Sequence, residues 1–171
     1  MKYVLLLISF MNFAGCYSYP TFNLREPIYL VQKPNHRWTC EKNSFASVCR
    51  RQIIDGIGMW FSHLSPEKRP RIILADEAPQ KTKNEVIFID YDRHLKTDGV
   101  FRWTLRPLTI FVKEILFGRL GYFLMAHEFG HAILGAEHKS IYSIMHADRA
   151  ALKPTPADIK WLHEKHPELS R

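Results

Sequence analysis

The segment from residue 119 to residue 134 contains no proline and carries apolar side chains on every side of a helical projection. We therefore predict a mostly buried helix there. Gly135 follows directly and is placed to end the helix in the left-handed conformation that glycine adopts readily. Inside this predicted helix lie His127, Glu128 and His131, in the order His-Glu-x-x-His.

The spacing of these histidines suits a metal ion. Residues four apart share one helix face with their Cβ atoms about 5–6 Å apart, so His127 and His131 can both reach one zinc ion at roughly 2.0–2.1 Å. His138, just beyond the predicted helix end, can supply the third ligand that a catalytic zinc site requires. Glu128 can take a proton from a zinc-activated water as that water attacks a scissile carbonyl.

With the third histidine included, the sequence HEFGHAILGAEH at 127–138 resembles the metzincin zinc metalloproteases, most closely their matrixin-like group. Ser143-Ile144-Met145 resembles the Met-turn of that family, whose methionine lies beneath the metal. The resemblance implies an α+β, metzincin-like fold: a small twisted mixed sheet with an N-terminal helix, an active-site helix and a C-terminal helix. It also implies a zinc-dependent endopeptidase, with Zn²⁺ as the cofactor and a protein or peptide as the substrate.

The same resemblance assigns a role to each matching residue. The metal ligands would be His127, His131 and His138, and Glu128 would be the general base that activates water for hydrolysis of the peptide bond. Met145 would be the methionine of the Met-turn.

One extra residue separates this chain from the family pattern, because Gly135 stands four residues after His131 where the family glycine stands three after. Counting from His127 places Glu137 in the position of the third ligand, whereas counting from Gly135 places His138 there. We favour His138, since the turn at the glycine sets the direction of the chain that follows. Glu137 remains the alternative, because carboxylates also bind zinc.

Other functions fit parts of the pattern. A non-catalytic zinc-binding envelope lipoprotein with the same fold is the alternative to an enzyme, although it would have no use for Glu128. A gluzincin-type enzyme would need a distant acid such as Glu164 as its third ligand, which leaves the third histidine unexplained. Near the site, His146 and Asp148 are expected to be surface residues rather than partners of the ligands. Surface positions are also expected for His36, His63, His94, His163 and His166.

The remaining patterns predict a sheet and two more helices. Apolar residues recur every three or four positions over 44–64, which predicts an amphipathic helix. Thr155 followed by Pro156 predicts a last helix that runs to about residue 166. Short β-branched runs predict strands at 28–31, 71–75 and 85–89, with one or two more, including a sheet edge, within 100–112.

The N-terminus has the layout of an export signal, with Lys2 before an apolar run too short to remain as a membrane span. The run ends at Phe13-Ala14-Gly15-Cys16, which resembles the bacterial lipobox. We therefore predict an exported chain with a lipid anchor on Cys16 in a bacterial cell envelope, and a soluble secreted or periplasmic form is the alternative. Cys40 and Cys49 then remain as a pair able to form a disulfide in an oxidising compartment, or as two free thiols.

Length and composition fit one folded domain. The chain has 171 residues, of which 46% are hydrophobic and 13% aromatic, enough to bury a core and too many for a disordered chain. We divide it into a signal peptide at 1–15, a tether with the first strand at 16–37, and a metzincin-like catalytic domain at 38–171. The net charge is +7, but the basic residues are scattered along the chain and no nucleic-acid motif accompanies them, so we expect no nucleic-acid partner.

Overall fold

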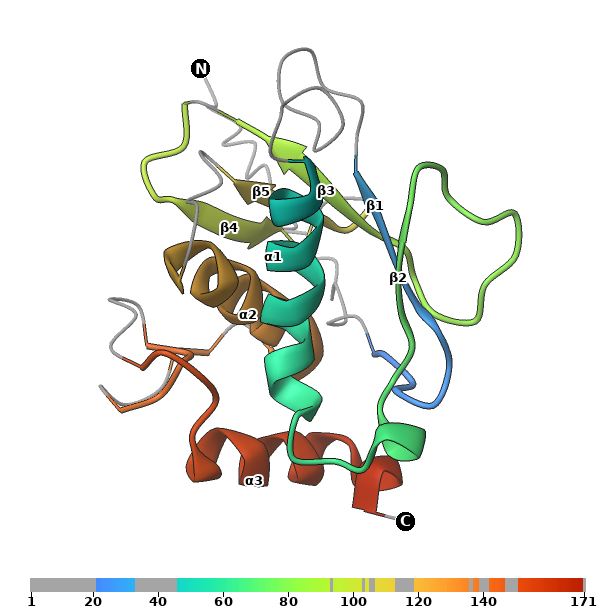
Figure 1. Ribbon diagram of the computed structural model, residues 1–171, viewed down its shortest axis with the longest axis vertical. Helices are drawn as coiled ribbons and strands as arrows, with labels where there is room; N and C mark the ends of the chain where they lie inside the picture. Colours follow the sequence, from blue (N-terminus) through green and yellow to red (C-terminus); the bar gives the residue numbers. More distant parts are fainter. Residues whose placement is uncertain are drawn as a thin grey trace, which may run out of the picture.

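The described part of the chain contains helices and one mixed sheet (Figure 1). A computed structural model describes residues 21–32, 46–92, 94–102, 104, 107–112, 119–135, 137–138, 142–146 and 151–170. These residues form three α-helices, three short 3-10 helices and a five-stranded sheet. The predicted α+β class with a mixed sheet is therefore confirmed at this coarse level.

The five strands lie in the order β2-β1-β3-β5-β4. Their bounds are β1 Ile28–Gln32, β2 Ile72–Ala75, β3 Ile87–Tyr91, β4 Gly99–Arg102 and β5 Thr109–Val112. All neighbours are parallel except β4, which runs antiparallel to β5 at one edge of the sheet. Every predicted strand is present, and the predicted 100–112 region supplies two strands, including the edge strand β4.

The strand β3 begins two residues later than the β-branched run predicts. The side chain of Asn84 binds another segment just before this strand: its amide donates to the carbonyl of Asn23 at 2.9 Å, and its oxygen accepts from the Asn23 amide at 2.9 Å. The same amide group also reaches the carbonyls of Glu26 and Pro27. These contacts fix the approach to β3 and delay its pairing with β1.

Three α-helices accompany the sheet: α1 Ala46–Gly58, α2 Arg119–Leu134 and α3 Pro156–Lys165. The helix α2 has the predicted bounds, and Gly135 after it has a φ of 117°, as predicted. Thr155 caps α3, because its side chain accepts from the Asp158 amide while the Asp158 carboxylate accepts from the Thr155 amide. Regular helix α1 ends at Gly58, and a 3-10 turn, η1 Met59–Phe61, continues the predicted helix.

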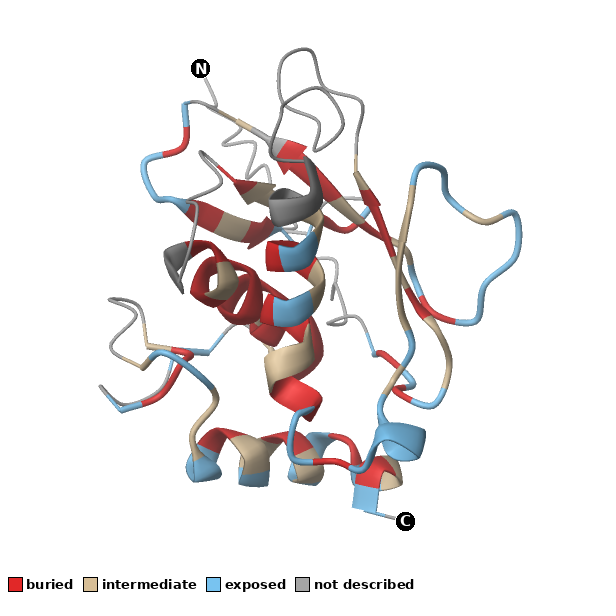
Figure 2. Ribbon diagram, viewed as in Figure 1, coloured by how far each residue is buried: buried red, intermediate tan, exposed pale blue. Residues whose placement is uncertain are grey.

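The core forms where α2 packs against α1 and against β4, and the buried residues gather along α2 (Figure 2). The two helices approach closely at Gly56, where a Cβ atom would lie 2.6 Å from the Tyr122 carbonyl oxygen. Trp60, which is fully buried, donates its indole N–H to the Ala126 carbonyl at 2.7 Å. The turn η1 therefore holds the middle of α2, one residue before His127.

Several sequence predictions fall outside the described residues. The predicted signal peptide, Cys16 and Cys40 lie outside them, and only the backbone of Cys49, within α1, is described. The lipid anchor, the disulfide and the domain bounds therefore stay predictions. No described helix combines the length and the hydropathy that a membrane crossing requires.

Candidate metal centre

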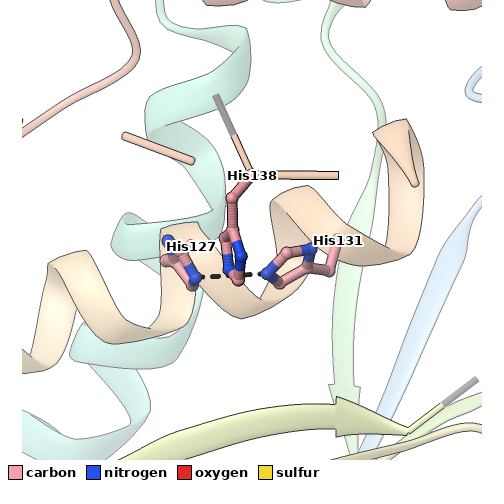
Figure 3. A group of neighbouring side chains, drawn as sticks. All are labelled: His127, His131 and His138. Atoms are coloured by element: carbon pink, nitrogen blue, oxygen red, sulfur yellow. Dashed lines mark hydrogen bonds between the residues drawn. The ribbon is translucent and has the colours of Figure 1, made fainter. Parts of the chain in front are cut away.

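Three histidines converge at the C-terminal half of α2 (Figure 3). His127 and His131 project from one face of the helix, and His138 returns from the chain after Gly135. One ring nitrogen of each lies within 4.8 Å of the others, so this group could hold a metal ion. His127 is buried, His131 is half-buried and His138 is exposed, which leaves one side of the group open to solvent.

The turn at Gly135 brings the third histidine back toward the helix. The Gly135 amide donates to the His131 carbonyl at 3.2 Å, which is a regular helical hydrogen bond. The positive φ of Gly135 then reverses the direction of the chain. The helix therefore stays regular through the extra residue that the family pattern lacks. His138 joins the histidine group after this turn, whereas Glu137 is exposed and is not part of it.

Two backbone carbonyls fix the orientation of the His127 and His131 rings. Nδ1 of His127 lies 2.7 Å from the Ile144 carbonyl, and Nδ1 of His131 lies 3.1 Å from the Gly135 carbonyl. A carbonyl oxygen only accepts hydrogen bonds, so both Nδ1 atoms must carry the proton. In the neutral rings, each Nε2 then presents a lone pair. Asp148, which is expected to be a surface residue, lies outside the described part of the chain.

The two lone pairs face each other, because Nε2 of His127 and Nε2 of His131 are 3.2 Å apart. Two acceptors at this distance repel unless a cation lies between them or one ring becomes charged. Two nitrogens bound to one tetrahedral zinc ion would be roughly 3.3 Å apart, given bonds of about 2.0–2.1 Å. The rings are thus arranged as ligands, and the donor set fits a metal ion.

The environment keeps His131 in the form that binds a metal. Burial lowers the pKa of His131 below its ordinary value, and the neighbouring His138 lowers it further, although the hydrogen bond to the Gly135 carbonyl opposes both effects. A lowered pKa keeps the ring neutral at pH 7, which a metal ligand must be.

A short turn at residues 142–146 packs against the part of α2 that carries the histidines. Met145 in this turn is fully buried against α2, where a Cβ atom at Gly130 would collide with the Met145 sulfur and lie 2.6 Å from Trp60 Cζ2. The glycine in the His-Glu-x-x-His segment therefore makes room for the methionine. Met145 accordingly lies beneath the helix that carries His127 and His131.

Asp158, in the first turn of α3, holds this turn in place. Its buried carboxylate accepts from the Ser143 hydroxyl, from the Ile144 amide at 3.2 Å and from the Thr155 amide at 2.8 Å. The Ile144 carbonyl in turn accepts from His127. The Thr-x-x-Asp spacing of Thr155 and Asp158 predicts the helix cap from the sequence. It does not reveal that Asp158 also accepts hydrogen bonds from Ser143 and Ile144.

Glu128 is buried beside the edge strand β4. A Cβ atom at Gly99 would lie 2.9 Å from Glu128 Oε1 and 2.6 Å from Leu124 Cδ1. Only a residue without a side chain allows the strand to approach the carboxylate this closely. The backbone of β4 therefore forms one wall around Glu128.

A cavity of about 810 Å³ lies beside the first half of α2. Its lining includes Tyr122 and Phe123, which precede His127 by about one helical turn, and Met59, Leu152 and Ile159. Leu152 is 52% exposed, which is unusual for a large apolar residue in this structure.

One of the expectations for the other histidines was wrong. His166 is buried, with Nε2 2.8 Å from the Ile133 carbonyl and Nδ1 3.1 Å from Glu168 Oε1, so it ties α3 to the end of α2. His94 and His63 are exposed as expected, His146 and His163 are half-buried, and His36 lies outside the described residues.

Comparisons with known proteins give no family for this chain. No protein-family model matches the sequence, and no curated protein matches it.

Proposed function

We propose that this protein is a zinc-dependent endopeptidase with a metzincin-like fold. The observation that carries this proposal is the pair of Nε2 lone pairs on His127 and His131, held 3.2 Å apart by two backbone carbonyls, with His138 completing the group. The order of the elements supports it, because an N-terminal helix, short strands, a histidine-bearing helix and a closing helix follow one another as the resemblance implies.

Zinc is the metal that suits these donors best. Three imidazoles favour Zn²⁺ over hard cations such as Mg²⁺ and Ca²⁺, and three protein ligands leave a coordination position open, as catalytic zinc sites do. A bound zinc ion would polarise a substrate carbonyl and lower the pKa of water to about 7.

The protein groups around the site have separate tasks. Glu128, next to the first ligand and buried, would accept the proton of the attacking water and later pass it to the leaving amine. The edge strand β4 would bind an extended peptide substrate along its backbone. The cavity beside Tyr122 and Phe123 would accept an apolar side chain of that substrate.

A zinc-loaded Glu128→Gln variant tests the proposal against the alternative of a non-catalytic zinc protein. We expect the wild-type protein to cleave members of a broad peptide library and E128Q to lose about 10²–10⁴-fold in rate with its zinc content unchanged. A wild-type protein that binds one zinc ion but cleaves no peptide, or an E128Q variant as active as the wild type, would overturn it.

We also propose that the chain is exported and anchored by a lipid on Cys16 in a bacterial cell envelope. The layout of the N-terminal sequence supports this location. Growth with a radiolabelled fatty acid tests it, because the label should enter the wild-type protein and be absent from a Cys16→Ser variant. Equal labelling of the two proteins would exclude Cys16 as the anchor.

A further inference from the structure

Two histidines that lie outside residues 127–138 are in contact with each other. His63, which follows η1, and His163, on α3, bring their Nε2 atoms within 2.9 Å of each other. His63 is exposed and His163 is half-buried, so an ion could reach the pair without any rearrangement of the core. Neither residue belongs to the histidine group at His127, His131 and His138, although His63 also lines the cavity beside Tyr122 and Phe123.

The geometry of this pair closely matches that of the two ligand histidines on α2. The ring centroids of His63 and His163 are 5.1 Å apart with the rings at 76°, against 4.8 Å and 87° for His127 and His131. The Nε2 atoms are 2.9 Å apart in one pair and 3.2 Å in the other. The 3.2 Å separation is close to the roughly 3.3 Å expected for two nitrogens on one tetrahedral zinc ion. The 2.9 Å separation in the second pair is a hydrogen-bond distance, so those two rings would move apart by about 0.4 Å to bind the same ion.

One tautomer of His63 presents a lone pair at Nε2. The nearby Trp60 carbonyl raises the pKa of the ring, as an acceptor does, and so favours a proton on the nitrogen that does not face His163. Nε2 faces His163, and a neutral ring carries one N–H, so Nε2 is the acceptor in this tautomer.

The partner ring can present either a donor or a lone pair. Nδ1 of His163 lies 2.8 Å from the hydroxyl oxygen of Ser170, and a hydroxyl can donate or accept. When Ser170 donates to Nδ1, Nε2 of His163 carries the proton and bonds to His63. When Ser170 accepts from Nδ1, Nε2 becomes a second lone pair directed at the same point. The change needs only the rotation of a hydroxyl.

We propose that His63 and His163 form a second metal site, which takes a divalent transition-metal ion such as Zn²⁺ and completes its coordination with water. Imidazole ligands select this class of ion over Ca²⁺ and Mg²⁺. With two protein ligands, the second site binds more weakly than the site at His127, His131 and His138. It does not depend on the proposed peptidase activity.

The protonation state of His63 favours this use. Burial lowers the pKa of His63, and the proximity of His163 lowers it further, while the bond to the Trp60 carbonyl opposes both. A metal ion competes with protons for the ring, so a lowered pKa helps the metal at neutral pH.

A metal ion at this pair would join two elements that both pack around α2. His63 follows the turn that carries Trp60, and His163 lies on the helix whose first turn contains Asp158. A ligand that binds only the folded state stabilises it, so zinc should raise the melting temperature in a second step above the concentration that fills the first site.

Zinc titration of the full-length protein tests the second site. In zinc-buffered solutions we expect two ions per chain in the wild-type protein and one in His63→Gln and in His163→Gln, with zinc affinity at the second site reduced at least about tenfold. The matched control is His94→Gln, which removes another exposed histidine and should still bind two ions. Circular dichroism checks that each variant is folded.

A variant that lacks the first site separates the two proposals. His131→Ala should bind one ion, and the double variant His131→Ala/His63→Gln should bind none. A wild-type protein that binds a single ion overturns the second site, and so does a second ion that persists in both His63→Gln and His163→Gln.

Discussion

The carbonyl of Ile144 accepts a hydrogen bond from Nδ1 of His127 at 2.7 Å, across seventeen positions of the chain. Through this bond, the turn at residues 142–146 determines which nitrogen of the first ligand faces the metal. The metal centre therefore depends on residues that never touch the ion.

Asp158 is expected to affect the metal through this turn. An Asp158→Asn variant keeps the shape of the side chain but replaces one acceptor oxygen with a donor, which opposes the Ser143, Ile144 and Thr155 donors. We expect the zinc affinity to fall about 10–100-fold. The free energy of unfolding should fall by about 1–3 kcal/mol.

Competition with a chromogenic zinc chelator measures the affinity, and urea unfolding measures the stability. Asp55→Asn, at an exposed position of α1, is the control and should change neither quantity. Unaltered zinc affinity in D158N, together with reduced stability, would limit Asp158 to a structural role.

The identity of the third ligand can be decided by zinc content. His138 lies in the histidine group and Glu137 does not, so His138→Ala should lose most of its zinc on dialysis, whereas Glu137→Ala should retain it. Elemental analysis of both proteins after the same dialysis gives the comparison. Greater loss from the Glu137 variant would reverse the choice of ligand.

Gly99 is expected to control the position of Glu128. In a Gly99→Ala variant the added methyl group would press on Glu128 Oε1 and Leu124 Cδ1, so the carboxylate must shift. We expect kcat to fall about tenfold or more, because small displacements of a catalytic group are costly, while the zinc content stays the same.

Gly58→Ala is the matched control for this change, since a Cβ atom there meets nothing within 4 Å and the residue has helical φ and ψ angles. It should retain full activity and gain up to about 1 kcal/mol in stability. Equal activity of the two variants would show that the approach of β4 does not position Glu128.

The stability of the metal-free protein should decrease in mild acid. The pKa of His131 is lowered in the folded state, so below the ordinary histidine pKa of about 6.5 the unfolded chain binds more protons than the folded one. The free energy of unfolding must then fall as the pH drops from 7 toward the lowered pKa. His63 acts in the same direction.

Urea unfolding of the zinc-free protein at pH 7.0 and pH 5.5, two values chosen to bracket about 6.5, measures this effect. A His131→Gln variant lacks the titrating ring and should lose less stability between the two values. The prediction fails if the wild-type and variant proteins show the same loss.

The parts of the fold that the sequence predicts well are those determined by neighbouring residues. The bounds of α2 follow from a long apolar run that ends at Gly135, and the start of α3 follows from Thr155 and Pro156. The delayed start of β3 could not be predicted, because it depends on Asn84 binding Asn23, sixty-one positions away. The strand order likewise depends on long-range pairing.

The candidate site also has features that the sequence predicts and features that it does not. The His-Glu-x-x-His spacing identifies two histidines of the group, because a helix fixes where residues four apart lie. The carbonyls of Ile144 and Gly135 that orient the rings belong to the backbone, and no side-chain type marks them. His166 shows the converse, because a histidine with no sequence partner is buried against the Ile133 carbonyl.

All three histidines of the group lie within residues 127–138, on one helix and the turn at Gly135 that ends it. Closing so short a loop costs little chain entropy compared with pairing distant strands. The three ligands can therefore come together without any long-range pairing of the chain. Only the orientation of the His127 ring depends on a more distant segment, through the Ile144 carbonyl.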